Sequence, residues 1–182
     1  LVLPKRAYHK TTNSHHRFYR HPNLLKPGQH QVVARQPEQV WVADITWLPL
    51  KTGTAYLSLV TDAWSRTIVG YHVHESLHTY HVVNAFRMAL AGRERVSQLI
   101  HHSDRGLQYC AAEYQELHKR HGVICSMTDG YDCYQNALAE RVNGILKMEY
   151  LLIKPENIEQ ARKMVKESVE IYNTQRPHLS LE

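Results

Sequence analysis

Three acidic residues occupy positions from which they could carry out metal-dependent chemistry. Asp44 interrupts an apolar run of β-branched and aromatic residues at 40–48, Asp104 follows an apolar run that ends at Ile100, and Glu140 lies in a helix-like segment. A buried carboxylate costs several kcal/mol unless it is paired or bound to a metal. Carboxylate oxygens suit Mg²⁺ or Mn²⁺ better than zinc. Two such ions about 3.5–4 Å apart stabilise the attacking and leaving oxygens of in-line phosphoryl transfer, so these acids predict that chemistry.

The rest of the pattern predicts the elements that position the acids. Three strands joined by short turns, at 40–48, 55–60 and 67–73, predict an antiparallel meander, followed by a strand that ends at Asp104 and a fifth at 123–127. Helices are expected from an N-cap at Thr79 to Gly92, over 111–121, over 136–149, and along an apolar stripe from Ile158 that ends before Tyr172. This order predicts an α/β fold with a five-stranded mixed sheet and helices on both faces. Short right-handed crossovers would place strand four beside strand one and bring Asp44 and Asp104 together.

The helix expected over 136–149 has two distinct faces at 100° per residue. One face is apolar and the opposite face is polar, the latter comprising Asn136, Glu140, Asn143 and Lys147. The apolar face can pack on the core while Glu140 and Lys147 point toward a ligand. The preceding loop, 128–135, has turn residues and no period, so we expect it to be mobile and to let Glu140 move.

The positive charge of the chain is concentrated at its N-terminus. Residues 1–37 contain seven basic residues and no acid, whereas residues 38–182 contain 15 basic and 17 acidic residues. We interpret 1–37 as a basic, mostly extended arm and 38–182 as the catalytic core. Such an arm is suited to DNA phosphates, and a solvated linker is the alternative interpretation. The three cysteines are odd in number and not spaced as CxxC pairs, so a reduced, cytoplasmic chain is expected. No apolar run approaches the roughly 20 residues of a membrane span, so no membrane partner is expected.

Five ordered segments resemble the DDE transposase and retroviral-integrase superfamily. They are W-V-A-D-I-T-W (41–47), L-V-T-D-A-W-S-R-T-I-V-G (59–70), H-S-D-R-G-L-Q-Y (102–109), N-A-L-A-E-R-V-N-G (136–144) and Y-N-T-Q-R-P-H (172–178). The chain is most similar to the catalytic domain of bacterial insertion-sequence transposases of the IS-three group. The 35 residues between Asp104 and Glu140 match the spacing that this superfamily favours.

This resemblance implies an RNase H-like fold, DNA cleavage and strand transfer. It implies that Asp44, Asp104 and Glu140 bind two Mg²⁺ ions, for which Mn²⁺ can substitute. It also implies DNA as the partner, a homodimer or higher assembly on transposon ends and target, and a bacterial, nucleoid-associated location.

Other residues are candidates for contacts around this site. His102, beside the Asp104 strand end, is a candidate to support a metal ligand, with packing as the alternative. The candidate DNA contacts are Lys147, Asn143, Arg105, Gln108, Arg17, Arg20 and Lys26.

Each acid also has a simpler explanation. Asp104 could cap a helix N-terminus, and Glu140 could be an ordinary solvated helix residue. Asp62 competes as a metal ligand, although its turn-rich surroundings favour a structural role with Ser65 or Arg66. At the level of function, the alternatives to a transposase are a non-catalytic DNA-binding or assembly module and an RNase H-like nuclease without strand transfer.

Overall fold

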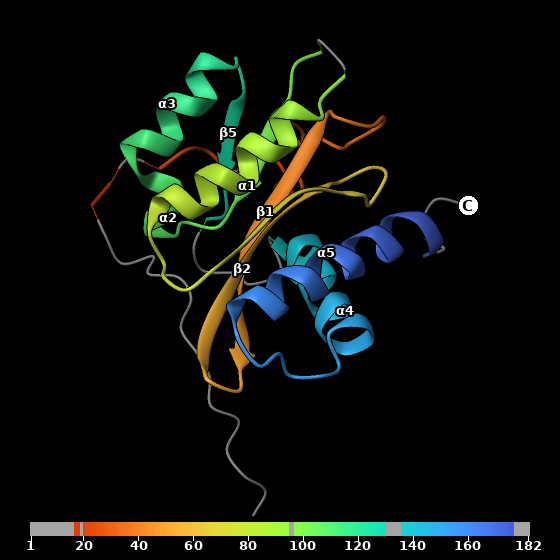
Figure 1. Cartoon of the computed structure of the whole chain (residues 1–182). Helices are drawn as coiled ribbons and strands as arrows, with labels where there is room; N and C mark the ends of the chain where they lie inside the picture. Colours follow the sequence, from red (N-terminus) through yellow and green to blue (C-terminus); the bar gives the residue numbers. More distant parts are fainter. Residues whose placement is uncertain (1–16, 19, 95–96, 130–135, 177–182) are drawn as a thin grey trace, which may run out of the picture.

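A five-stranded mixed sheet lies at the centre of the computed structural model, which describes residues 17–18, 20–94, 97–129 and 136–176 (Figure 1). The strands are β1 (Val40–Leu50), β2 (Gly53–Asp62), β3 (Ile68–His74), β4 (Ile100–Ser103) and β5 (Ile124–Met127). Their order across the sheet is β3-β2-β1-β4-β5. The first three strands pair antiparallel, whereas β4 pairs parallel to both β1 and β5. The expected meander and the return of β4 beside β1 are therefore confirmed.

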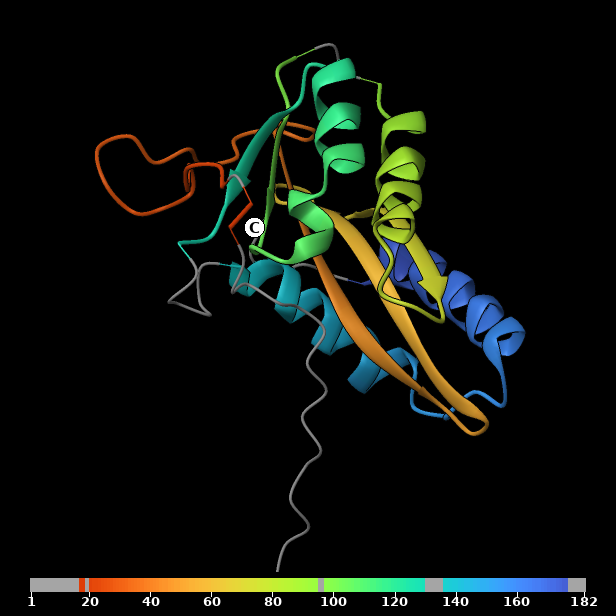
Figure 2. The same cartoon turned by 90° about the vertical axis from the view of Figure 1, so that its left-hand side faces the viewer.

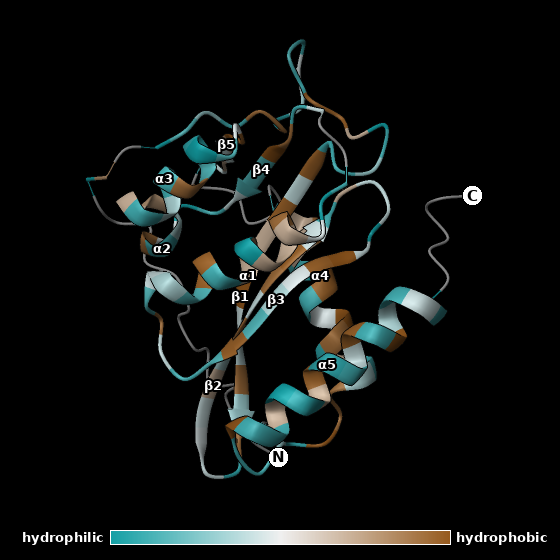
Figure 3. Cartoon of the chain, turned by 45° about the horizontal axis from the view of Figure 1, so that its top comes forward, coloured by the Kyte–Doolittle hydropathy of each residue, from teal (hydrophilic) through white to brown (hydrophobic). Residues whose placement is uncertain are grey.

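Helices cover both faces of the sheet, as expected for this strand order (Figures 1 and 2). On one face, α1 (Thr79–Ala91), α2 (Leu107–Cys110) and α3 (Ala112–Arg120) bury a core with Trp41, Ala43 and Ile45 of β1. On the other face, α4 (Ala137–Ile145), the π-helix η2 (Leu146–Tyr150) and α5 (Ile158–Gln175) bury a second core with residues of β1, β2 and β3. Figure 3 shows α5 striped with apolar and hydrophilic residues, as expected for a helix with one buried face. None of the described helices is long and apolar enough to span a membrane.

The helical boundaries differ from the predictions in four places. The helix expected over 136–149 changes at Leu146 into a wider turn, in which the Leu151 N–H donates to the Leu146 carbonyl at 2.8 Å. The segment before α3 forms the separate one-turn helix α2. His78 rather than Thr79 precedes the first turn of α1, and it makes no side-chain cap. The terminal helix continues past Tyr172, which is buried in the core, to Gln175.

Glycine permits the close packing of α1 on the edge strand β3. A Cβ atom on Gly70 would lie 2.2 Å from the carbonyl oxygen of Ala85, well inside van der Waals contact. Any larger side chain at this position would push α1 away from the sheet.

The described residues of the N-terminal arm contain no helix or strand. Several residues within 20–37 nevertheless contact the sheet. The Pro22 carbonyl accepts a hydrogen bond from the Met127 N–H of β5 at 3.3 Å. Figure 2 shows the red and orange arm beside the teal β5. The division of the chain at residue 37 stays a prediction, and the loop expected to be mobile, beyond Asp129, lies outside the described residues.

Candidate active site

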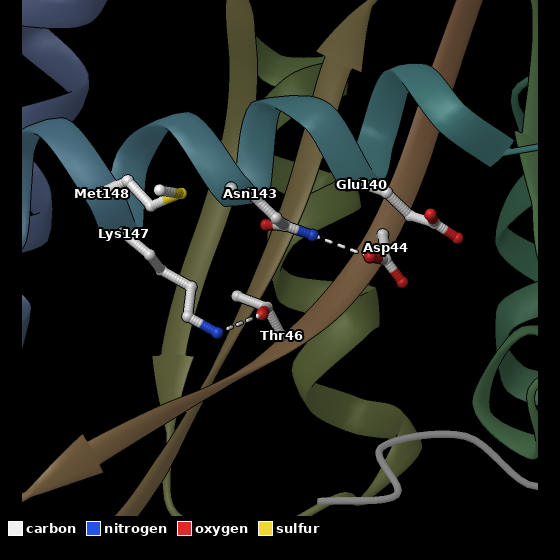
Figure 4. A pocket seen from close by; sticks show the side chains of 7 residues that line it. Asp44, Thr46, Glu140, Asn143, Lys147 and Met148 are labelled. Carbon is white, nitrogen blue, oxygen red and sulfur yellow. Dashed lines mark hydrogen bonds between the residues drawn. The ribbon is translucent and has the colours of Figure 1, made fainter. Parts of the chain in front are cut away.

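Asp44 projects from the middle of β1 toward α4. Because side chains alternate along a strand, Ala43 and Ile45 face the core beneath α1, while Asp44 and Thr46 face the opposite side. The amide nitrogen of Asn143 donates to Asp44 Oδ2 at 2.8 Å (Figure 4). Burial, and then the nearby negative charge of Asp104, raise the pKa of Asp44 to about 7. The hydrogen bonds from the Ile45 backbone and from Asn143 oppose this rise by favouring the charged form.

Asp104 directly follows the last residue of β4. The parallel ladder pairs Val42 of β1 with His102 of β4, and Asp44 and Asp104 lie two residues further along their respective chains. Asp104 Oδ1 accepts a hydrogen bond from the Gly106 N–H at 2.9 Å. The N-cap of α2 is Gly106, so the alternative in which Asp104 caps this helix is wrong.

Glu140 lies in the first turn of α4 and lines the same pocket as Asp44. Burial, followed by the charge of Asp104, raises the pKa of Glu140. Asp104 therefore acts electrostatically on both other carboxylates. The three predicted acids therefore lie close enough to influence one another's charge, and Asp44 and Glu140 line the same pocket.

This pocket has a volume of about 340 Å³ and lies between β1 and α4 (Figure 4). Lys147 Nζ donates to Thr46 Oγ1 at 3.1 Å across it. Burial lowers the pKa of Lys147, and the charge of Asp44 opposes this effect. The full lining is Asp44, Thr46, Glu140, Asn143, Gly144, Lys147 and Met148.

Sequence reasoning missed Thr46 and Met148 as parts of this pocket, whereas 100° per residue already places Gly144 at the edge of the polar helix face. The alternation of β1 could have identified Thr46, since it lies two residues from Asp44 on the same face of the strand. The widened turn of η2, which carries Met148, had no signal in the residue pattern.

The donor set has the chemistry that a divalent cation requires. The three acids carry hard oxygen donors, and burial, together with repulsion from Asp104, raises the pKa of both Asp44 and Glu140. A dication would relieve this repulsion. Within the described ranges, however, no three histidine, cysteine or acidic side chains gather closely enough to hold a metal ion as they stand, and Asp104 does not line the pocket.

The other candidate residues have varied surroundings. Arg17 and Arg20 are exposed, and the side chain of Lys26 is 63% exposed and pairs with Asp129 at 2.9 Å. Arg105 is mostly buried and lies 3.8 Å from the same carboxylate group.

Two candidates lie in positions that favour structural roles. Gln108 is buried and donates to the Leu77 carbonyl at 2.9 Å, so we do not retain it as a DNA contact. His102 is fully buried, and its Nδ1 lies 2.8 Å from Ser126 Oγ. Its predicted support of a metal ligand stays a prediction.

Asp62 has the structural role that the sequence favoured. Its buried carboxylate accepts hydrogen bonds from the Trp64 N–H, the Ser65 N–H and the Ser65 hydroxyl, at 3.0, 2.7 and 3.0 Å. It also accepts one from the Glu38 N–H at 2.6 Å, where the arm joins β1. Of the two expected partners of the Asp62 carboxylate, Ser65 and Arg66, the structure shows Ser65.

Comparison with solved structures identifies the fold. The chain superposes on the HTLV-2 integrase catalytic core domain in complex with magnesium (dimeric form) with a TM-score of 0.64 and 21% identity, covering 80% of this chain and 92% of that one. It superposes on the simian T-cell lymphotropic virus intasome, solved with a PP2A regulatory subunit, with a TM-score of 0.69 and 18% identity, covering 92% and 57%. The predicted RNase H-like fold is confirmed.

Sequence comparison gives closer relatives. An uncharacterised 31 kDa protein of insertion element IS600 from Shigella sonnei is 38% identical over 179 residues, which is 97% of this chain and 65% of the relative. The transposase InsF of insertion sequence IS3A from Escherichia coli K12 is 40% identical over 127 residues, which is 70% of this chain and 43% of the relative. The chain thus spans less than two thirds of the length of either relative.

Family comparison covers residues 34–182. The integrase core domain family matches residues 34–133, and a second integrase core domain family matches residues 121–182. Together with the transposase relatives and the integrase-like fold, these matches confirm the family that the sequence motifs indicate. The chain belongs to the integrase core domain family of transposases and retroviral integrases.

Proposed function

We propose that this chain is the catalytic core of an insertion-sequence transposase, which cuts transposon-end DNA and joins its 3′-hydroxyl to a target. The observation that carries the proposal is the electrostatic coupling of three carboxylates around one pocket. Asp44 and Glu140 line this pocket, and Asp104 follows β4, the strand that pairs in parallel with the strand of Asp44. Burial, and then the charge of Asp104, raise the pKa of both Asp44 and Glu140. Clustering like charges is costly for a fold, so such a cluster favours a functional explanation.

Asp44, Asp104 and Glu140 are the residues that would hold divalent metal ions, with Mg²⁺ expected and Mn²⁺ as a substitute. When bound there, two such ions would activate the attacking water or hydroxyl and stabilise the departing oxygen. The HTLV-2 core, which has the same fold, is in complex with magnesium.

The remaining pocket residues orient the acids and the DNA. Asn143 holds Asp44 in place through its amide, so its proposed role shifts from direct DNA contact to orienting the carboxylate. Lys147 donates to Thr46 and has further N–H groups for a DNA phosphate entering the pocket. Arg17 and Arg20 are proposed to contact the DNA backbone outside the pocket, since they are exposed. Lys26 pairs with Asp129, so we do not retain it as a DNA contact.

The proposed assembly is a homodimer or larger complex, because transposition joins two DNA ends to one target. The HTLV-2 core has been solved in dimeric and trimeric forms.

The test is neutralisation of each acid in a full-length transposase that carries this sequence. Asp44→Asn, Asp104→Asn and Glu140→Gln should each abolish Mg²⁺-dependent strand transfer while leaving DNA binding nearly intact, because each removes a metal ligand without removing a cation. Glu113→Gln, which changes an exposed acid on α3, serves as the matched control and should retain activity.

Gel assays that resolve cleavage from strand transfer distinguish the alternatives. Strand transfer that survives in any of the three variants would refute the assignment of the acids. Cleavage without joining by the wild-type protein would favour a nuclease, and DNA binding without either reaction would favour a non-catalytic module.

A further inference from the structure

Residues 20–37 run along β5, the strand at one edge of the sheet. The Met127 N–H donates to the Pro22 carbonyl at 3.3 Å, and the Leu24 N–H donates to the Ser126 hydroxyl at 3.0 Å. In addition, His21 Nε2 lies 2.6 Å from the side-chain amide oxygen of Gln115 in α3. We call residues 20–37 the strap, since these contacts join it to a strand and to a helix far along the chain.

The strap also packs on a cluster to which the helix that carries Glu140 contributes one residue. Its apolar side chains contact a small cluster that is separate from the two main cores and includes Ala139, the residue immediately before Glu140. The cluster also contains Val40, Val42 and Ile100, from the strands that lead to Asp44 and Asp104. The strap residues packed on it are Leu24, Leu25, Val32 and Ala34.

Polar contacts connect the strap to the segments around Asp104. Ser126, which accepts from the strap, also lies 2.8 Å from His102 Nδ1 of β4. The Asp129 carboxylate lies 2.9 Å from Lys26 of the strap and 3.8 Å from Arg105, the residue after Asp104. Asp129 therefore bridges the strap and the segment that holds Asp104.

We propose that the strap positions the reactive acids, and that Asp129 is a positioning residue that transmits the docking of Lys26 to the Asp104–Arg105 segment. Docking limits the motion of Ala139 and of the end of β4, and so limits the separations that the three carboxylates can adopt. The inference rests on the proposed function, because it assumes that these acids form the reactive site. A strap that undocks would loosen the site without unfolding the sheet.

Variants of the strap test this coupling in the chain as it stands. Lys26→Glu replaces attraction to Asp129 with repulsion, whereas Lys26→Arg preserves the ion pair. Leu24→Asp is a second way to release the strap, since it introduces a charge into the apolar contact. The matched control is Lys51→Glu, which reverses an exposed ion pair with Glu156 between the β1–β2 turn and the start of α5.

Two measurements report the result. Hydrogen exchange at the Met127 amide, measured without metal, reports strap docking, and exchange along α4 reports the mobility of the Glu140 helix. Electron paramagnetic resonance of Mn²⁺ measures the affinity of the site for the ion. Lys26→Glu should accelerate both exchange signals and weaken Mn²⁺ binding by about threefold, the factor expected for one exposed ion pair. Leu24→Asp should have the same effects, and Lys26→Arg and Lys51→Glu should have neither.

The outcomes separate this inference from the proposed function. Faster exchange at Met127 with unchanged exchange in α4 and unchanged Mn²⁺ affinity would show that the strap is passive and overturn the inference. Unchanged exchange at Met127 in both Lys26→Glu and Leu24→Asp would overturn it as well. If the wild-type chain binds no Mn²⁺ at the acids, the metal-dependent function fails, while exchange in α4 still decides whether the strap controls this helix.

Discussion

At the residue scale, Asp44 shows what a local pattern can and cannot reveal. A charged residue in an apolar strand is visible in the sequence, and so is the strand alternation that turns it away from the α1 face. Its hydrogen bond from Asn143 joins residues 99 positions apart, so no local signal predicts it. The sequence led us to expect a DNA contact for Asn143, whereas the structure shows its amide on the carboxylate.

We predict that Asn143→Ala weakens Mn²⁺ binding about tenfold, the lower end of the range for removing a residue that orients a metal ligand. The reason is that Asp44 loses a donor that favours its charged form, while burial and Asp104 still raise its pKa. Titration calorimetry measures the affinity. Met148→Ala is the control, because Met148 lines the same pocket without a hydrogen bond to the acid. An equal loss in both variants would assign the effect to the pocket rather than to the hydrogen bond.

At the element scale, periodicity predicted which segments are helices and strands but not every helical boundary. The order of elements and the strand neighbours followed from apolar runs and from connection rules. The one-turn helix α2 and the wide turn of η2 did not, because tertiary packing decides such features. The sequence pattern also did not predict that two histidines are buried. His101 and His118 lie in the core between β4, α1 and α3.

His118 predicts an acid-sensitive junction between α1 and α3. Its ring stacks on Phe86 with centroids 4.3 Å apart, and its Nδ1 lies 2.7 Å from the Tyr114 carbonyl. Burial lowers the pKa of His118 to about 4, with a smaller effect from His21 of the strap, and burial also lowers the pKa of the neighbouring His101. Between the unfolded value of 6.5 and about 4, the unfolded chain binds the proton more readily, so stability is lost as the pH falls.

We expect His118→Phe to flatten this part of the stability profile. The native histidine should contribute up to about 3 kcal/mol of pH-dependent stability over this range, at 1.36 kcal/mol for each unit of pKa difference. Phenylalanine preserves the stack and does not titrate, while His101 retains a residual dependence. Urea unfolding at pH 7.5, 6, 5 and 4.5 measures the free energy of unfolding. Parallel profiles for the two proteins would show that His118 does not cause the acid sensitivity.

At the scale of the whole molecule, the basic arm of residues 1–37 has a part that packs on the sheet, which its charge does not reveal. Composition predicted a basic arm that ends near residue 37, and counting charges could not reveal that residues 20–37 pack on β5 and on the cluster around Ala139. Those contacts are long-range and involve few side chains, so they leave no periodic pattern. The arm thus combines exposed cations with a strap that belongs to the core.

Two truncations separate these two roles. Deleting residues 1–18 removes Lys5, Arg6, Lys10 and Arg17, and should reduce the salt dependence of DNA binding by up to about 0.9 in log–log slope for each phosphate that is no longer neutralised. It should leave stability unchanged. Deleting residues 1–37 should also lower the free energy of unfolding by at least about 1.5 kcal/mol, the value for exposing one buried aliphatic side chain. Filter binding from 50 to 200 mM salt and urea unfolding measure the two effects; an unchanged slope would show that residues 1–18 do not touch DNA.

The wide turn of η2 allows one continuous helical segment to satisfy two different rotational requirements. Residues before it are phased so that Glu140 and Asn143 face the pocket, while Tyr150 at its end packs edge-on against Tyr172 of α5, with ring centroids 6.2 Å apart. An α-helix rotates by about 100° per residue, so a regular helix of this length would misdirect one of the two faces. The turn therefore lets the pocket residues and the core residues of this segment point in their own directions. Deletion of one residue from η2 would rotate the residues after it, so the segment could keep either its pocket contacts or the packing of Tyr150 on Tyr172.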